Sequence, residues 1–260
     1  MKSGSVVALN CLNPHGFTNP KTWYCNCDII QRYLKPNDVV YFDDGKVVCI
    51  VLEISNEGCM LEVKIGGPLK SHSQIRFVGG KHKNLPMLSE SDISDLKEIT
   101  KVINIDYFVI PFASSGSDIK QVRTALGEGG SNIKVLAKID TIHGIENFEE
   151  IITQADGMVM CRNELQWEIP SEKLMIAQKW AIQQCNKNAK LFIVQAQVLE
   201  SMLADKQPSR QELTEISTAT LDGADSFILS HETSIGKNSI ATTVNLAKAI
   251  AEAEAIFDYD

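Results

Sequence analysis

The chain has 260 residues, of which 44% are hydrophobic and 22% charged, a composition typical of a globular protein with a sizeable core. Its net charge of -8 excludes the sequence-independent nucleic-acid binding that a strongly basic surface would support. No stretch approaches the ~18 consecutive apolar residues of a membrane span, so neither a nucleic acid nor a membrane is expected as a partner.

Seven cysteines are spread along the chain without a CxxC pair. Cys25 and Cys27 have no second pair or histidine cluster at the spacing of a zinc site. Reduced and mostly buried thiols are therefore expected, and they indicate an intracellular, cytoplasmic protein. The N-terminus also lacks the basic and apolar regions of a signal peptide.

Short β-strands separated by turns are expected between residues 39 and 77. Apolar, β-branched runs at 39–42, 47–54 and 60–65 alternate with glycine-containing turns. Gly79-Gly80 and Leu85-Pro86 then indicate a linker. The sequence predicts a small β domain over residues 1–84, with a divergent N-terminus, followed by a second domain over residues 85–260.

Apolar strands alternate with amphipathic helices after the linker. The strands are expected to begin near residues 106, 133, 157, 191 and 226, and the helices to cover 118–126, 145–152, a run from 171, 212–221 and 239–257, after a first helix opened by Ser89. This order predicts an α/β fold with a parallel sheet and right-handed crossovers. Doubly wound sheets and barrels both have this pattern, but no strand is followed by a glycine-rich nucleotide-binding motif.

Charged side chains follow two neighbouring strands of this predicted sheet. Lys138 and Asp140 close one apolar run, and Glu164 follows the next run shortly after Cys161. Ligands bind at the carboxyl ends of parallel strands in both candidate folds. A lysine beside two carboxylates at that edge predicts a site for a divalent metal ion and a phosphate group.

Three longer strings are more specific than these single residues. They are DGMVMCRNELQWEIP at 156–170, VLESM at 198–202, and LDGADSFILSHET at 221–233. Together they resemble pyruvate kinase, whose patterns are DGIMVARGDLGxEIP, TQMLESM and LDGADxxMLSGET. The YFDDG string at 41–45 also resembles a turn of that family's small β domain. The resemblance runs from about Trp23 to the C-terminus.

The resemblance implies transfer of a phosphoryl group from phosphoenolpyruvate to ADP, a step of glycolysis that uses Mg²⁺ and K⁺. It implies a TIM-type (β/α)8 barrel with a small β-barrel domain inserted after the third strand. The five strands would be strands four to eight, so we expect a partial TIM-type barrel with a remnant of the inserted domain. The family's first three strands, which carry a phosphate-binding arginine and the K⁺ ligands, have no counterpart here.

The resemblance also assigns roles to individual residues. Lys138 matches the catalytic lysine, which stabilises charge on the transferring phosphoryl group. Asp140 and Glu164 match the two Mg²⁺ ligands, with Asp in place of the family's Glu and Glu in place of its Asp. Asn163 and Ala196 replace a glycine and a threonine that contact substrate, so these two positions are degenerate. Further departures from the family pattern are Ser114, Thr141, Gln166, which Trp167 follows, and His231.

These departures favour a catalytically impaired pyruvate kinase-like protein that acts as a structural or interaction subunit. Five strands would leave two open sheet edges, which barrels avoid by closing. We therefore expect a protein partner, such as another pyruvate kinase-like chain or a large assembly, unless the sheet rearranges or the chain is a fragment. Two alternatives are an active or weakly active pyruvate kinase and a regulatory module that binds a small metabolite such as phosphoenolpyruvate or ADP.

Overall fold

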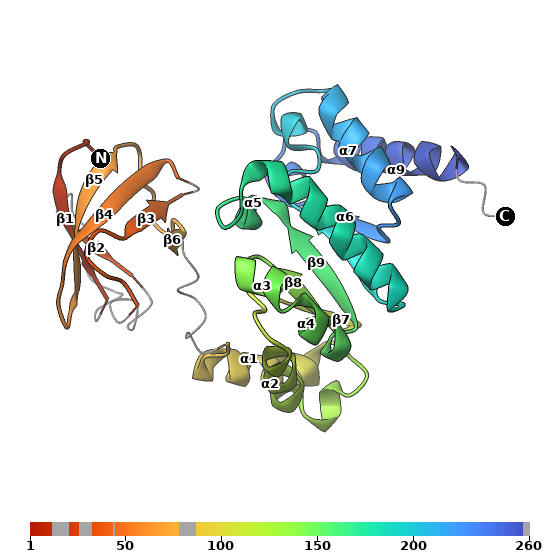
Figure 1. Ribbon diagram of the computed structural model, residues 1–260, viewed down its shortest axis with the longest axis horizontal. Helices are drawn as coiled ribbons and strands as arrows, with labels where there is room; N and C mark the ends of the chain where they lie inside the picture. Colours follow the sequence, from red (N-terminus) through yellow and green to blue (C-terminus); the bar gives the residue numbers. More distant parts are fainter. Residues whose placement is uncertain (12–20, 26–32, 44, 78–86, 257–260) are drawn as a thin grey trace. The chain divides into compact units, whose positions relative to one another are not determined.

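The computed structural model describes residues 1–11, 21–25, 33–43, 45–77 and 87–256. The chain forms two compact units, Met1–Leu85 and Pro86–Asp260, each of which is described by itself (Figure 1). Across the described ranges, every helix is too short or too polar to span a bilayer.

The first unit is a six-stranded sheet in the order β2-β1-β5-β4-β3-β6. Its strands are β1 (Val6–Asn10), β2 (Thr22–Tyr24), β3 (Val39–Phe42), β4 (Val47–Ile54), β5 (Gly58–Ile65) and β6 (Ile75–Phe77). All neighbours are antiparallel except β1 and β2, which run parallel. The hairpins predicted between residues 39 and 77 agree with β3 to β6, whereas β1 and β2 were not predicted.

The core of the first unit is formed by the inward-facing side chains of its strands, which alternate with more exposed ones. Val47, Cys49 and Val51 of β4 are fully buried, as expected where every second side chain faces inward. Trp23 of β2 packs edge-on against Phe42 of β3, with ring centroids 5.0 Å apart. The N-terminal strands therefore complete the same core as the predicted hairpins.

The second unit is a parallel five-stranded sheet in the order β11-β10-β9-β8-β7. The strands are β7 (Tyr107–Ile110), β8 (Lys134–Ile139), β9 (Gly157–Cys161), β10 (Leu191–Gln195) and β11 (Ser226–Ile228). The longer helices are α1 (Glu90–Val102), α2 (Gly116–Leu126), α4 (Phe148–Gln154), α6 (Ser171–Lys187), α7 (Arg210–Leu221) and α9 (Ser239–Ile256). Short helical turns are η3 (Glu128–Gly130), α3 (Ile142–Glu146), α5 (Arg162–Leu165), η4 (Glu200–Leu203) and α8 (His231–Ser234). This half-barrel sheet confirms the predicted α/β fold with a partial barrel.

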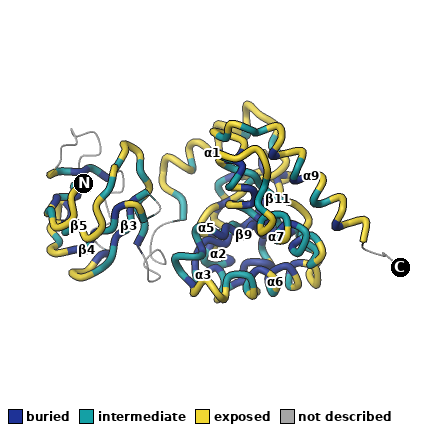
Figure 2. Tube along the Cα trace, turned by 90° about the horizontal axis from the view of Figure 1, so that it is seen from above, coloured by how far each residue is buried: buried dark blue, intermediate teal, exposed yellow. Residues whose placement is uncertain are grey.

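The centre of the sheet is the most buried part of the second unit. Every residue of β9 is buried, and the strand is dark blue in Figure 2. Met158 and Met160 belong to the main core cluster, together with Phe192 of β10 and residues of the covering helices. On the other face, a Cβ atom at Gly157 would lie 2.8 Å from the Cβ atom of Leu191 and 2.9 Å from a methyl of Leu136. Only glycine therefore fits at this crossing of three strands.

One predicted helix is wrong in detail. The apolar spacing predicts one helix over residues 145–152, but the structure has α3 and α4 with Asn147 between them. The Asn147 amide donates a hydrogen bond of 2.7 Å to the Ser114 carbonyl, which lies 33 residues away in the chain. This tertiary contact holds Asn147 outside helical geometry, and local spacing carries no signal of it.

Candidate functional site

Strand β8 ends in a close ion pair. The Lys138 Nζ atom lies 3.7 Å from the Asp140 Oδ2 atom, and the Asp140 side chain is fully buried while that of Lys138 is 18% exposed. Lys138 shares a strand face with Leu136 and Lys134, because side chains alternate along a strand. The structure therefore brings together the predicted catalytic lysine and one predicted metal ligand at the carboxyl end of the strand.

A strained turn after β7 supports Asp140. The Phe112 N–H donates a hydrogen bond of 2.9 Å to the Asp140 Oδ2 atom. Phe112 has φ +55°, a left-handed conformation that is uncommon for a bulky residue. Such strain persists only where surrounding contacts hold it, and this hydrogen bond is one such contact. The turn thus fixes the orientation of the buried carboxylate.

The next strand end carries the other predicted residues. Glu164 and Asn163 lie in α5, one turn beyond the end of β9, and both are partly buried. Asn163 lies in helix α5 and is not among the residues with positive φ, so its Cβ atom causes no backbone strain. Its side-chain Oδ1 accepts a hydrogen bond of 2.9 Å from the Cys161 thiol, and its carbonyl accepts one of 3.0 Å from Gln166.

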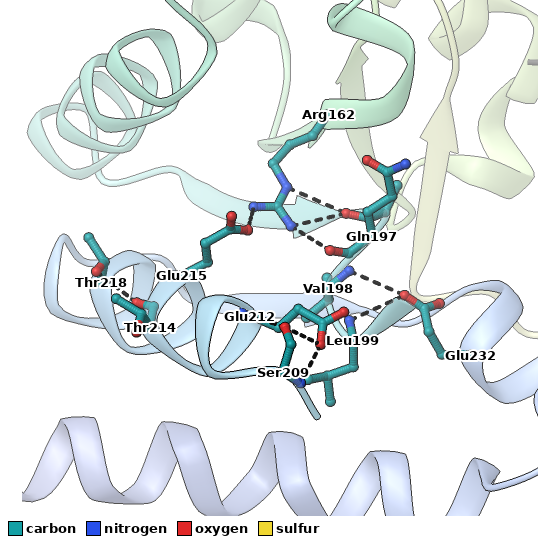
Figure 3. Close-up of polar contacts among 11 residues, drawn as sticks. Arg162, Gln197, Val198, Leu199, Ser209, Glu212, Thr214, Glu215, Thr218 and Glu232 are labelled. Carbon is teal, nitrogen blue, oxygen red and sulfur yellow. Dashed lines mark hydrogen bonds and ion pairs between the residues drawn. The ribbon is translucent and has the colours of Figure 1, made fainter. Parts of the chain in front are cut away.

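Arg162 links the ends of β9 and β10 to helix α7. It is 7% exposed and donates hydrogen bonds to the carbonyls of Ala196 at 3.2 Å and Gln197 at 2.9 Å (Figure 3). Its third contact is an ion pair of 2.6 Å with Glu215 of α7. These contacts hold the backbone at the end of β10 in place.

The two residues whose carbonyls accept hydrogen bonds from Arg162 have unusual backbone angles. Ala196 and Gln197 have φ values of +71° and +52°, so two successive non-glycine residues are left-handed. Each such residue costs of order 1 kcal/mol or more, and surrounding contacts must compensate. Ala196 is 6% exposed and presents a methyl group where the family resemblance expects a threonine hydroxyl.

One buried and one partly buried carboxylate hold the neighbouring loop. Glu232 is 2% exposed and accepts hydrogen bonds from the backbone N–H groups of Val198 and Leu199 (Figure 3). It also accepts one from the backbone N–H of Ser230. Glu212 accepts bonds from Ser201 and Ser209; burial raises the pKa of Glu212, but these hydrogen bonds outweigh it and lower the pKa overall. Both carboxylates are satisfied by the protein itself, which assigns them a structural role at the sheet edge.

The predicted residues occupy the ends of three consecutive strands. Asp140 follows β8, Glu164 follows β9 and Ala196 follows β10, in the order of the strands in the sheet. Over the described ranges, no three His, Cys, Asp or Glu side chains form a group able to hold a metal ion. Two carboxylates nevertheless suit Mg²⁺, which keeps several waters and commonly binds one or two carboxylates together with substrate phosphates.

Sequence reasoning missed the two features that shape the site most. Arg162 was not predicted as a site residue, because its partners Ala196 and Glu215 lie 34 and 53 positions away in the chain. The left-handed turn at Phe112 likewise has no local signal, since phenylalanine is not a residue that favours positive φ. Both become visible only when the strand ends are brought together.

The parallel half-barrel sheet, with charged side chains at the carboxyl ends of its strands, is that of a protein of the β/α-barrel class. The family model described as "Pyruvate kinase, barrel domain" matches residues 4–243. The chain belongs to the pyruvate kinase family. This match begins earlier than the resemblance expected from about Trp23, in agreement with the participation of β1 in the first core.

Individual relatives give the same assignment. The chain is 37% identical to human "Pyruvate kinase PKLR" over 238 residues, covering 91% of this chain and 41% of the relative. It is 36% identical to the rat protein of the same name over 235 residues, covering 90% and 41%. It is 32% identical to "Pyruvate kinase" of Eimeria tenella over 235 residues, covering 90% and 44%. The chain thus spans less than half the length of these relatives.

Proposed function

We propose that this chain is a pyruvate kinase-like protein with impaired catalysis that acts as a structural or interaction subunit. This proposal rests on the end of β10. Ala196 offers only a methyl group there, and its carbonyl accepts a hydrogen bond from Arg162. Asn163 adds side-chain atoms at the neighbouring strand end, where the resemblance expects glycine. Both changes remove or obstruct contacts that would orient a substrate, and positioning supplies much of the rate in phosphoryl transfer.

A protein partner that completes the barrel belongs to this proposal. Strands β7 and β11 are the edges of the parallel sheet among the described residues. Sheet edges present unpaired N–H and C=O groups that readily accept a further strand. Another pyruvate kinase-like chain or a large assembly would supply that strand, and the cytoplasm is the compartment we propose.

The second candidate function is an active or weakly active pyruvate kinase, which converts phosphoenolpyruvate and ADP to pyruvate and ATP. The ion pair of Lys138 with Asp140 and the position of Glu164 favour it. Asp140 and Glu164 would hold Mg²⁺, which would supply charge stabilisation to the phosphoryl group. Lys138 would place its ammonium group beside the transferring phosphate, at the strand end where barrel enzymes bind their ligands.

A coupled assay that detects pyruvate from phosphoenolpyruvate, ADP, Mg²⁺ and K⁺ separates the two functions. The impaired subunit should show no turnover above that of Lys138→Met. Lys134→Met is the matched control, because Lys134 lies on the same strand face with a side chain that is 60% exposed. Turnover that is lost in Lys138→Met and kept in Lys134→Met would establish the enzyme instead.

The regulatory alternative is tested by binding without turnover. A ligand of the native state raises the unfolding midpoint by mass action. Thermal unfolding with phosphoenolpyruvate, ADP or Mg²⁺ therefore reports binding directly, and a rise in the midpoint without pyruvate formation would favour a metabolite-binding module.

A further inference from the structure

Asp140 is fully buried, although it directly follows the end of β8. Its side chain has no exposed surface, and its Oδ1 atom is among the buried side-chain oxygens. Glu164, the other residue that the resemblance assigns to Mg²⁺, is only partly buried. Mg²⁺ dehydrates reluctantly and usually keeps several of its water molecules when it binds a protein. A carboxylate without solvent contact is therefore poorly placed to hold such a hydrated ion.

The contacts of Asp140 point to a different role. Its Oδ2 atom accepts the hydrogen bond of 2.9 Å from the Phe112 N–H and lies 3.7 Å from the Lys138 Nζ atom. A divalent cation at this oxygen would compete with the N–H for the lone pairs and would be repelled by the ammonium group. A Phe112 N–H that lost its acceptor in this partly buried position would add a further cost.

The turn after β7 is attached to the end of β8 by two consecutive hydrogen bonds. The Phe112 N–H donates to the Asp140 carboxylate, and the Ala113 N–H donates a bond of 3.3 Å to the Lys138 carbonyl. Phe112 has φ +55°, whereas Ala113 is not among the residues with positive φ. The contact with the strained residue is thus the one that depends on a side chain, and Asp140 provides it.

The length of the side chain at position 140 agrees with this role. The family resemblance expects glutamate here, whose carboxylate lies one methylene further from the backbone. The shorter aspartate keeps its carboxylate near its own strand, within hydrogen-bonding distance of the neighbouring strand end. The change from glutamate to aspartate therefore favours a backbone contact over a ligand that reaches into the site.

We propose that Asp140 is a positioning residue that holds the left-handed turn at Phe112, with Lys138 as its counter-ion, and that it does not bind the divalent metal ion. The residue types at the two strand ends suit Mg²⁺, but the burial and the contacts of Asp140 do not. This inference rests on the proposed function, because it gives a physical reason for impaired catalysis. It argues against the metal site of the second candidate function.

The first measurement is the affinity for Mn²⁺, which replaces Mg²⁺ because it can be followed by electron paramagnetic resonance. Asp140→Asn removes the negative charge and preserves the size of the side chain, so its Mn²⁺ affinity should differ from that of the wild type by less than about twofold. Absence of binding in both proteins also agrees with the inference. An affinity weakened about tenfold or more in Asp140→Asn would overturn it, since that result would identify Asp140 as a ligand.

The second measurement is amide hydrogen exchange at Phe112, resolved by NMR. Asp140→Ala removes the acceptor, so exchange at Phe112 should become about tenfold faster or more. Asp140→Asn retains an oxygen acceptor and should have a smaller effect. Glu164→Ala is the matched control and should leave this exchange unchanged. Unchanged exchange in Asp140→Ala, or equal acceleration in Glu164→Ala, would contradict the role of Asp140 in the turn.

Circular dichroism of each variant checks that the fold is retained, and Asp140→Asn keeps the inference testable if Asp140→Ala does not fold. Pyruvate formation by the wild-type chain would contradict the proposed function, whereas Mn²⁺ affinity and exchange at Phe112 report on Asp140 alone. The two failures are therefore distinguishable.

Discussion

Ala189 occupies the position after α6 that normally belongs to glycine. Its φ is +50°, and the N–H groups of Lys190 and Ala189 bond to the carbonyls of Cys185 and Asn186, the pattern that ends many helices. An alanine pays a steric cost in this left-handed conformation, whereas glycine does not.

We therefore expect Ala189→Gly to raise the free energy of unfolding by about 0.5–1 kcal/mol. The urea midpoint measures this change. Ala247→Gly, in the exposed interior of α9, is the matched control and should lower stability by about 1 kcal/mol. A lower midpoint for Ala189→Gly would show that the helix end does not need the left-handed residue.

Burial also sets the chemistry of the thiols. It raises the pKa of Cys49 to about 12, that of Cys59 to about 11 and that of Cys185 to about 12. Since the thiolate is the reactive form, we expect iodoacetamide at pH 8 to leave these three cysteines unmodified in the native protein and to modify them in urea. Peptide mass spectrometry reads out each site, and rapid native labelling of Cys185 would contradict the packing of α6.

For individual residues, the sequence predicted which side chains lie at the strand ends better than it predicted their backbone conformations. Lys138 and Asp140 could be placed at a strand end because an apolar run stops there. The left-handed backbone angles of Ala196 and Gln197 could not be predicted, because they depend on contacts with Arg162, which lies 34 and 35 positions earlier in the chain.

At the scale of helices and strands, Asp156 connects helix α2 to the beginning of strand β8. Its Oδ2 atom accepts hydrogen bonds from Arg123 at 2.7 Å and from the Val135 N–H at 2.8 Å. Burial alone would raise the pKa of Asp156, but the hydrogen bonds from Arg123 and Val135 outweigh it and lower the pKa.

A carboxyl whose pKa is lower in the folded state stabilises the protein above its unfolded pKa of about 4, and that contribution is lost as the pH falls through the folded pKa. We expect Asp156→Asn to cost about 1–2 kcal/mol at pH 7, with a smaller difference from wild type near pH 3. Urea unfolding across this pH range measures both values. Glu98→Gln, which breaks an exposed pair with Lys101, should change stability by less than about 0.5 kcal/mol, and an equal loss there would argue against a specific role for Asp156.

Elements with strong local patterns were predictable, and those made by distant partners were not. The five parallel strands follow from their apolar runs and intervening helices. Strands β1 and β2 were missed because β1 pairs with β5, about fifty residues later in the chain. The break at Asn147 was missed for the same reason, since its partner Ser114 is distant in sequence.

For the whole molecule, the two units have separate hydrophobic cores. Leu61 is fully buried in the first core and Phe192 in the second, and the two clusters share no residue. We expect Leu61→Ala to cost about 2–5 kcal/mol in the first unit and Phe192→Ala about 3–5 kcal/mol in the second. Hydrogen exchange resolved by peptide should show faster exchange only in the unit that carries the change; faster exchange in both units would mean that they unfold together.

The order of the parallel strands has a consequence for the time course of folding. Strands β7 to β11 lie in the sheet in the same order as in the chain, so each pairs with the strand made just before it. Ribosomes add roughly 5–20 residues per second, so each new strand and helix emerges within seconds of its neighbour. The sheet can therefore grow one strand at a time during synthesis, in the order from β7 to β11.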